Sequence, residues 1–120
     1  MSDLNTTVTG MMGIDGALGA AIVDYQSGLL LAGEGGGVDL ELAAAGNSEV
    51  VKAKMKTMAS LGIEGNIDDI LITLETQMHI IRPSVSNDGL FLYLVLDKKN
   101  SNLALARRKI LGLENELERI

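Results

Sequence analysis

The spacing of apolar and polar positions predicts a hairpin near the start of the chain. Residues 17–23 are a run of small and branched apolar residues, and residues 29–32 are a second short apolar run. Between them, Asp24 and Gly28 frame a five-residue turn. An aspartate accepts hydrogen bonds from a turn backbone, and a glycine adopts the positive φ that such a loop needs. We therefore expect two antiparallel strands joined by a tight turn.

Helical spacing predicts three helices. The first covers residues 4–12, with Ser2 or Asp3 as its N-cap and Gly13 at its end. The long second helix covers residues 40–61, between a capping Asp39 and Gly62. The third starts after Ser101 or Asn102. Its apolar stripe favours packing on a core over a coiled coil, and comprises Leu103, Ala106, Ile110, Leu113, Leu117 and Ile120.

Three more strands are expected between the second and third helices. Residues 67–76 alternate, which indicates a half-covered edge strand. Residues 78–82 follow and end at Pro83, which cannot donate to a ladder. Residues 90–96 are apolar on both faces and fit the middle of a sheet. The predicted fold class is α+β: one domain, residues 1–120, with an antiparallel five-stranded sheet in the order α-β-β-α-β-β-β-α.

The long helix offers a smooth face. Ala43, Ala44, Ala45 and Gly46 let another backbone come near, whereas Ser48, Glu49 and Lys52 are expected on the opposite face. Two interpretations stay open: packing on the sheet alone, or packing on both the sheet and a twin helix. Asn47 and Lys54 lie beside the apolar stripe and favour an interface.

Composition narrows the function. The net charge of -6 argues against a nucleic-acid partner, because phosphate binding needs a basic stripe. No segment approaches the ~20 apolar residues of a membrane span. The sequence has no cysteine and its start does not resemble a signal peptide, so we expect a cytoplasmic protein.

Candidate chemistry is sparse. Residues 33–37 (GEGGG) precede the long helix, but Val38 and Asp39 break both phosphate-loop patterns, so we interpret them as a pliable link. His79 is the single histidine and is expected on a strand surface; Asp68 and Asp69 are expected to mark a strand start. We predict no catalytic residue, metal site or cofactor, and hence no enzyme. Arg82, Arg107 and Arg108 are candidates for partner contacts.

The hairpin and the element order resemble the roadblock / dynein-light-chain domain family. The resemblance rests on Gly13-Ile14-Asp15-Gly16-Ala17, then Ala21-Ile22-Val23-Asp24, then Ser27 to Ala32. It covers most of the chain and suits the single-domain bacterial or archaeal type. It implies a dimer in which the long helices pair and the following edge strand meets its twin. The implied interface residues are Ala43, Ala44, Asn47, Val51, Lys54, Met58, Leu71 and Thr73.

The resemblance also implies a function. Family members bind Ras-like small GTPases, and some activate hydrolysis by the partner GTPase while others are adaptors. The sequence is therefore expected to encode a non-catalytic dimeric regulator of a small GTPase. Two alternatives stay open. One is a small-ligand sensor that uses space above Gly19, Ala20 and Ala21; the other is a structural adaptor without a GTPase partner.

Overall fold

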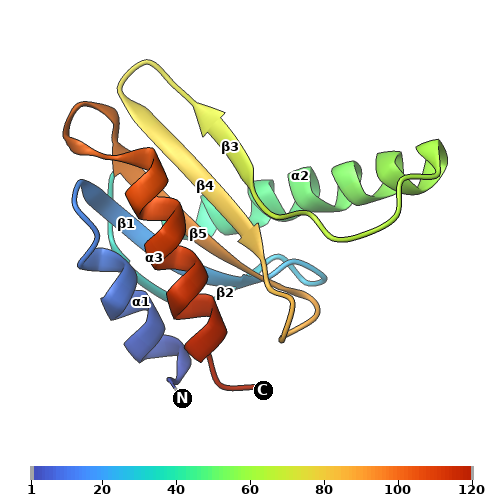
Figure 1. Ribbon diagram of the computed structural model, residues 1–120, viewed down its shortest axis with the longest axis horizontal. Coiled ribbons are helices and arrows are strands. Elements are labelled where there is room, and N and C mark those ends of the chain that lie inside the picture. Colours follow the sequence, from blue (N-terminus) through green and yellow to red (C-terminus); the bar gives the residue numbers. More distant parts are fainter. Residues whose placement is uncertain (1, 120) are drawn as a thin grey trace.

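The computed structural model describes residues 2–119, which form one α+β unit (Figure 1). The elements follow the predicted order. They are α1 (Leu4–Met12), β1 (Ala17–Asp24), β2 (Leu29–Gly35), α2 (Leu40–Leu61), β3 (Ile70–Thr73), β4 (Gln77–Pro83), β5 (Leu90–Asp97), a 3-10 turn (Lys98–Asn100) and α3 (Leu103–Glu116). All neighbouring strands are antiparallel, in the order β2-β1-β5-β4-β3.

Helices cover both faces of the sheet. In Figure 1, α1 and α3 lie side by side on one face, while α2 crosses behind the sheet and its C-terminal half projects beyond it. The two ends of the described chain also meet: Ser2 donates its N–H to the Glu116 carbonyl and accepts from Glu118. The α1–α3 contact is close because Gly10 has no side chain; a Cβ there would lie 2.8 Å from Leu113 Cδ2.

Alternation along β1 divides the core in two. Ala20 and Ile22 face α1 and α3, whereas Ala21 and Val23 face α2. Both alanines are completely buried. The neighbouring Gly19 lies against backbone, since a Cβ there would be 2.2 Å from the Gly36 carbonyl oxygen. Protein therefore fills the space above these small residues, which counts against a ligand cavity at that place.

The hairpin turn forms as its residues predict, but β2 is longer than expected. Asp24 Oδ1 accepts from the Gln26 N–H at 2.9 Å, and Gly28 has a φ of 79°. The strand then continues through Gly35, and the Gly36 N–H donates to the Leu18 carbonyl. The prediction of a pliable link was wrong for residues 33–35, which belong to β2, whereas residues 36–39 do connect the strand to α2. The glycines of residues 33–37 let the backbone of this stretch approach β1.

The observed ends of β3 and α3 differ from the predicted ends by a few residues. The expected strand 67–76 is limited to Ile70–Thr73, because the residues before it are engaged by arginines and Leu74 donates back to Gln77 across a turn. Helix α3 continues past Gly112 and ends at Glu116. Leu117 then adopts an extended conformation and is buried. Ile120, the last position of the predicted stripe, lies outside the described residues.

Candidate functional site

Helix α2 is the element that carries the candidate surface. Asp39 Oδ1 accepts from the Leu42 N–H at its start, and Gly62, with a φ of 71°, ends it in the left-handed conformation. Ala44, Ser48 and Val51 face the sheet and are buried. Ser48 was expected on the opposite face; its hydroxyl is instead satisfied inside the helix by donating to the Ala44 carbonyl at 2.6 Å. A buried serine tolerates this position because it needs no partner outside its own helix.

The outward side of α2 carries several exposed apolar side chains. Leu42 is 71% exposed, Val50 39% and Leu61 65%. Gly46 and Ala53 are exposed between them, at the spacing that places all five on one side of a helix. Large apolar side chains that lie in one row without a cover are typical of a contact surface.

The residues predicted for the interface divide into two groups. Ala44 and Val51 are buried in the core, and Leu71 packs against the core under α3. Lys54 and Thr73 are exposed, whereas Ala43, Asn47 and Met58 are half-buried at the flank of α2. Sequence reasoning did not single out Leu42, Val50 or Ala53 as exposed apolar residues. The signal was present as a second apolar row, but the first row, which faces the sheet, concealed it.

Strand β3 is one edge of the sheet, as its alternation predicts. It pairs with β4 from Ile70 opposite Ile81 to Thr73 opposite Met78. Ile70 and Ile72 pack against the α2 side of the core, while Leu71 lies on the α3 side. The backbone groups on the outer side of a four-residue edge strand are available to another strand.

A polar chain links the sheet to the start of α2. The Tyr93 hydroxyl lies 3.0 Å from His79 Nδ1, and His79 Nε2 lies 2.9 Å from Gln77 Oε1. Gln77 Nε2 donates to the Gly37 carbonyl, and the Asn47 side chain bonds to Tyr93. With its proton on Nε2, His79 donates to Gln77 Oε1 and accepts from the Tyr93 hydroxyl at Nδ1, so every hydrogen bond in the row has one donor and one acceptor. His79 is therefore a half-buried structural group, and the prediction of a plain surface histidine was wrong.

Burial shifts the pKa values of His79 and Tyr93, two members of this hydrogen-bonded row of side chains. It lowers the pKa of His79, because desolvation disfavours the imidazolium. It also raises the pKa of Tyr93, an effect that the hydrogen bond from Asn47 opposes. Both groups are neutral near pH 7, and the ring nitrogens of His79 contact an amide and a phenol. The Tyr93 phenol bonded to His79 is only 1% exposed and its pKa is raised, so it is shielded from solvent and stays protonated near pH 7.

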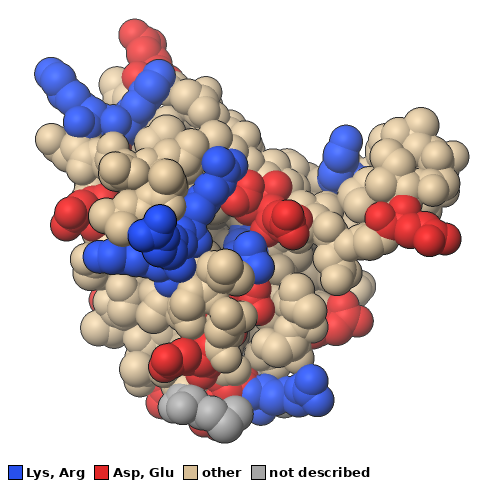
Figure 2. All heavy atoms as spheres, viewed as in Figure 1, with Lys and Arg blue, Asp and Glu red and all other residues tan. Residues whose placement is uncertain are grey.

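Two of the arginines proposed for partner contacts are used inside the chain. Arg82 Nε bonds to Glu114 Oε1 at 2.7 Å, and Arg82 also donates to the Asp68 carbonyl. Arg107 donates two hydrogen bonds to the Asp69 carboxylate, from Nε to Oδ2 at 2.8 Å and from Nη2 to Oδ1 at 3.0 Å. In Figure 2, the basic side chains on the α3 side are interspersed with acidic ones. This surface is not the uniform basic stripe that nucleic acid requires.

No group of three or more His, Cys, Asp or Glu residues between residues 2 and 119 could hold a metal ion. No helix in the same range is long and apolar enough to cross a membrane.

Comparison by sequence finds no relative: no family model matches, and no curated protein matches. Comparison by structure finds the fold. A Roadblock/LC7 domain from Streptomyces avermitilis has a TM-score of 0.80 at 16% identity, over 95% of this chain and 93% of its own. MglB from Myxococcus xanthus has a TM-score of 0.75 at 17% identity, over 94% and 86%. An MglB structure described as having a tetrameric arrangement has a TM-score of 0.77 at 17% identity, over 91% and 80%.

Proposed function

From the premise that this chain has the roadblock fold, we propose that it is a non-catalytic, dimeric regulator or adaptor of a Ras-like small GTPase. The observation that carries the proposal is the exposed apolar row on α2, which lies on the helix that the roadblock resemblance assigns to dimer contacts. An MglB neighbour with a tetrameric arrangement supports an assembly of this kind. A cytoplasmic location belongs to the same proposal.

The proposed dimer contact uses α2 and the edge of β3. From the predicted set, Ala43, Asn47, Lys54 and Met58 border the apolar row and Thr73 lies on the edge strand. Ala44, Val51 and Leu71 would support the contact from the core. Burying Leu42, Val50 and Leu61 between two copies would remove the exposed parts of three large apolar side chains from water.

Light scattering tests the dimer. The chain should have about twice its mass of 12.7 kDa at micromolar concentration. Val50→Glu should shift the mass towards the monomer, because it places a charge in the apolar row. Leu111→Glu is the matched control: Leu111 is 42% exposed on α3, so the same kind of change lies on another helix. A monomeric parent chain, or an equal effect of both variants, would contradict the proposed contact.

Affinity purification with GDP or a GTP analogue tests the partner. A Ras-like GTPase should co-purify in one nucleotide state more than in the other. The Leu111→Glu variant should still form the dimer and retain the GTPase. A stable dimer that retains no GTPase in either state would favour the second candidate, a structural adaptor. The filled space above Ala20 and Ala21 makes the ligand-sensing alternative the weakest of the three.

A further inference from the structure

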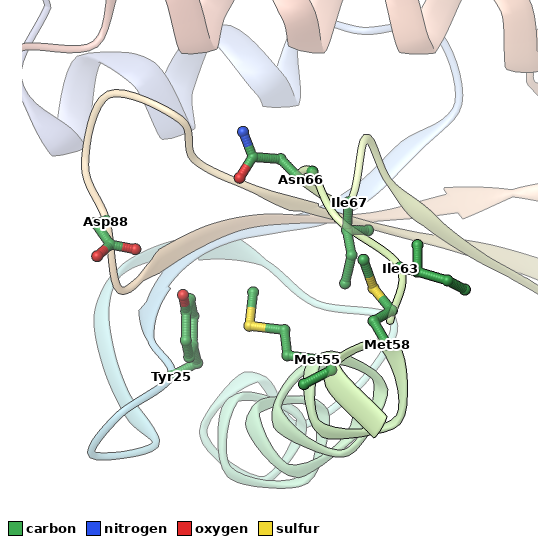
Figure 3. A pocket seen from close by; sticks show the side chains of 9 residues that line it. Tyr25, Met55, Met58, Ile63, Asn66, Ile67 and Asp88 are labelled. Atoms are coloured by element: carbon green, nitrogen blue, oxygen red, sulfur yellow. The ribbon is translucent and has the colours of Figure 1, made fainter. Parts of the chain in front are cut away.

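A cavity of about 290 Å³ lies between the C-terminal half of α2 and the turn of the hairpin. One side of it is apolar: Met55 and Met58 come from α2, and Ile63 and Ile67 come from the loop that follows (Figure 3). Ile63 is 52% exposed at the rim, so the cavity opens to the surface. Methionine side chains are flexible and adapt to an inserted group. This side of the cavity therefore suits an unbranched apolar stem.

The opposite end of the cavity is polar. Tyr25 is only 5% exposed, and its ring stacks on Phe91 with centroids 6.4 Å apart. In Figure 3, the Tyr25 hydroxyl points into the cavity on the side of Asp88. A rigid, buried ring thus holds a hydroxyl beside an exposed carboxylate, which can receive the N–H groups of an incoming ligand.

The charge at this end is negative. Burial raises the pKa of Tyr25 first, and the charges of Asp88 and Asp24 raise it further, while a hydrogen bond from Gly89 opposes them. Arg119 lines a separate hollow with the same two aspartates, and no ion pair joins it to them among residues 2–119. A cation is the complement of this field.

The size of the cavity limits what can enter. Sites for drug-sized ligands and cofactors occupy ≈ 300–1,000 Å³, so this one, at the lower limit, suits a single side chain better than a cofactor. Arginine combines an apolar stem with a planar group that makes several N–H bonds to carboxylate and hydroxyl oxygens. We propose that this cavity is a docking site for an arginine side chain of a protein partner. The proposal is independent of whether that partner is a GTPase.

Methyl-labelled methionine provides a direct test by NMR on the full chain. The probe is arginine with both backbone ends blocked, and the matched control is blocked citrulline, which has the same shape without the charge. The methyl signals of Met55 and Met58 should shift saturably with the arginine probe. Those of Met11 and Met78, which are buried on the α3 side of the sheet, should not. Citrulline should bind at least tenfold more weakly.

Variants separate the polar contacts from the fold. Asp88→Asn and Tyr25→Phe should each weaken the arginine probe about tenfold, whereas Asp15→Asn, on the loop before β1, should leave its affinity unchanged. Equal binding of citrulline, uniform shifts of all methionines, or no saturable shift would overturn the proposal. So would methyl signals of Met55 and Met58 that move with protein concentration and then ignore the probe, because a second copy of the chain would fill the cavity.

Discussion

Tyr93 and His79 are joined across two neighbouring strands by a bond of 3.0 Å between the phenol oxygen and Nδ1, with the two rings edge to face. The bond fixes the imidazole as an acceptor on one side and a donor on the other. It lies below the start of α2, next to the hollow bordered by Ala43, Gly46 and Asn47. The single histidine of the chain thus supports the helix that we propose as the contact surface.

This arrangement predicts a pH dependence of stability. Burial lowers the pKa of His79 in the folded chain below its ordinary value of 6.5, so the unfolded chain binds the proton more readily. The contribution of His79 is complete above pH 6.5 and is lost as the pH falls towards the folded pKa. Urea unfolding should be measured at pH 7.5, 6.5 and 5.5. The difference in the free energy of unfolding between the parent chain and His79→Gln should become smaller as the pH falls.

The matched variant for this experiment is Tyr93→Phe. It removes the phenol that bonds to Nδ1 but keeps the histidine, so its unfolding should remain sensitive to pH between 7.5 and 5.5. If His79→Gln follows the same pH profile as the parent, the histidine does not titrate between the two states and the prediction fails.

The contact between β1 and the glycine-rich stretch predicts a large effect at Gly19. Gly19→Ala would bring a methyl group to 2.2 Å from the Gly36 carbonyl oxygen, so the backbone would have to move. We expect a loss of about 1–3 kcal/mol in the free energy of unfolding. Gly112→Ala is the control, since nothing lies within 4 Å of its new methyl group. In the middle of a helix it should gain about 1 kcal/mol. Thermal unfolding that shifts both variants in the same direction would contradict this.

The two arginine pairs predict unequal costs. Glu114 is 3% exposed and Arg82 is 16% exposed, so Glu114→Gln would leave a largely buried guanidinium without its counter-charge. We expect a loss of about 3–5 kcal/mol in the free energy of unfolding. Arg107 is 42% exposed, and Arg107→Gln should cost less than about 1 kcal/mol. Urea denaturation measures both. Similar losses would mean that burial does not decide the strength of these pairs.

Local patterns were sufficient for the order of elements, because caps, turns and periodicity act over a few residues. Asp39 and Gly62 bound α2 as predicted, and Asp24 and Gly28 form the turn as predicted. Boundaries that depend on distant residues were less accurate. Strand β3 begins late because Asp69, just before it, is held by Arg107 from a helix 38 positions away, a pairing that no local pattern encodes.

The sequence by itself determined the fold class, the edge position of β3 and the lack of a recognisable catalytic motif, since each follows from residue types and short spacings. Tertiary structure alone decided which side of α2 is free. Ser48 and Val51 face the sheet, while Leu42 and Val50 do not, because the buried side is set by how α2 packs against the strands. The cavity beside Tyr25 is likewise tertiary, since its lining comes from a turn, a helix and two loops.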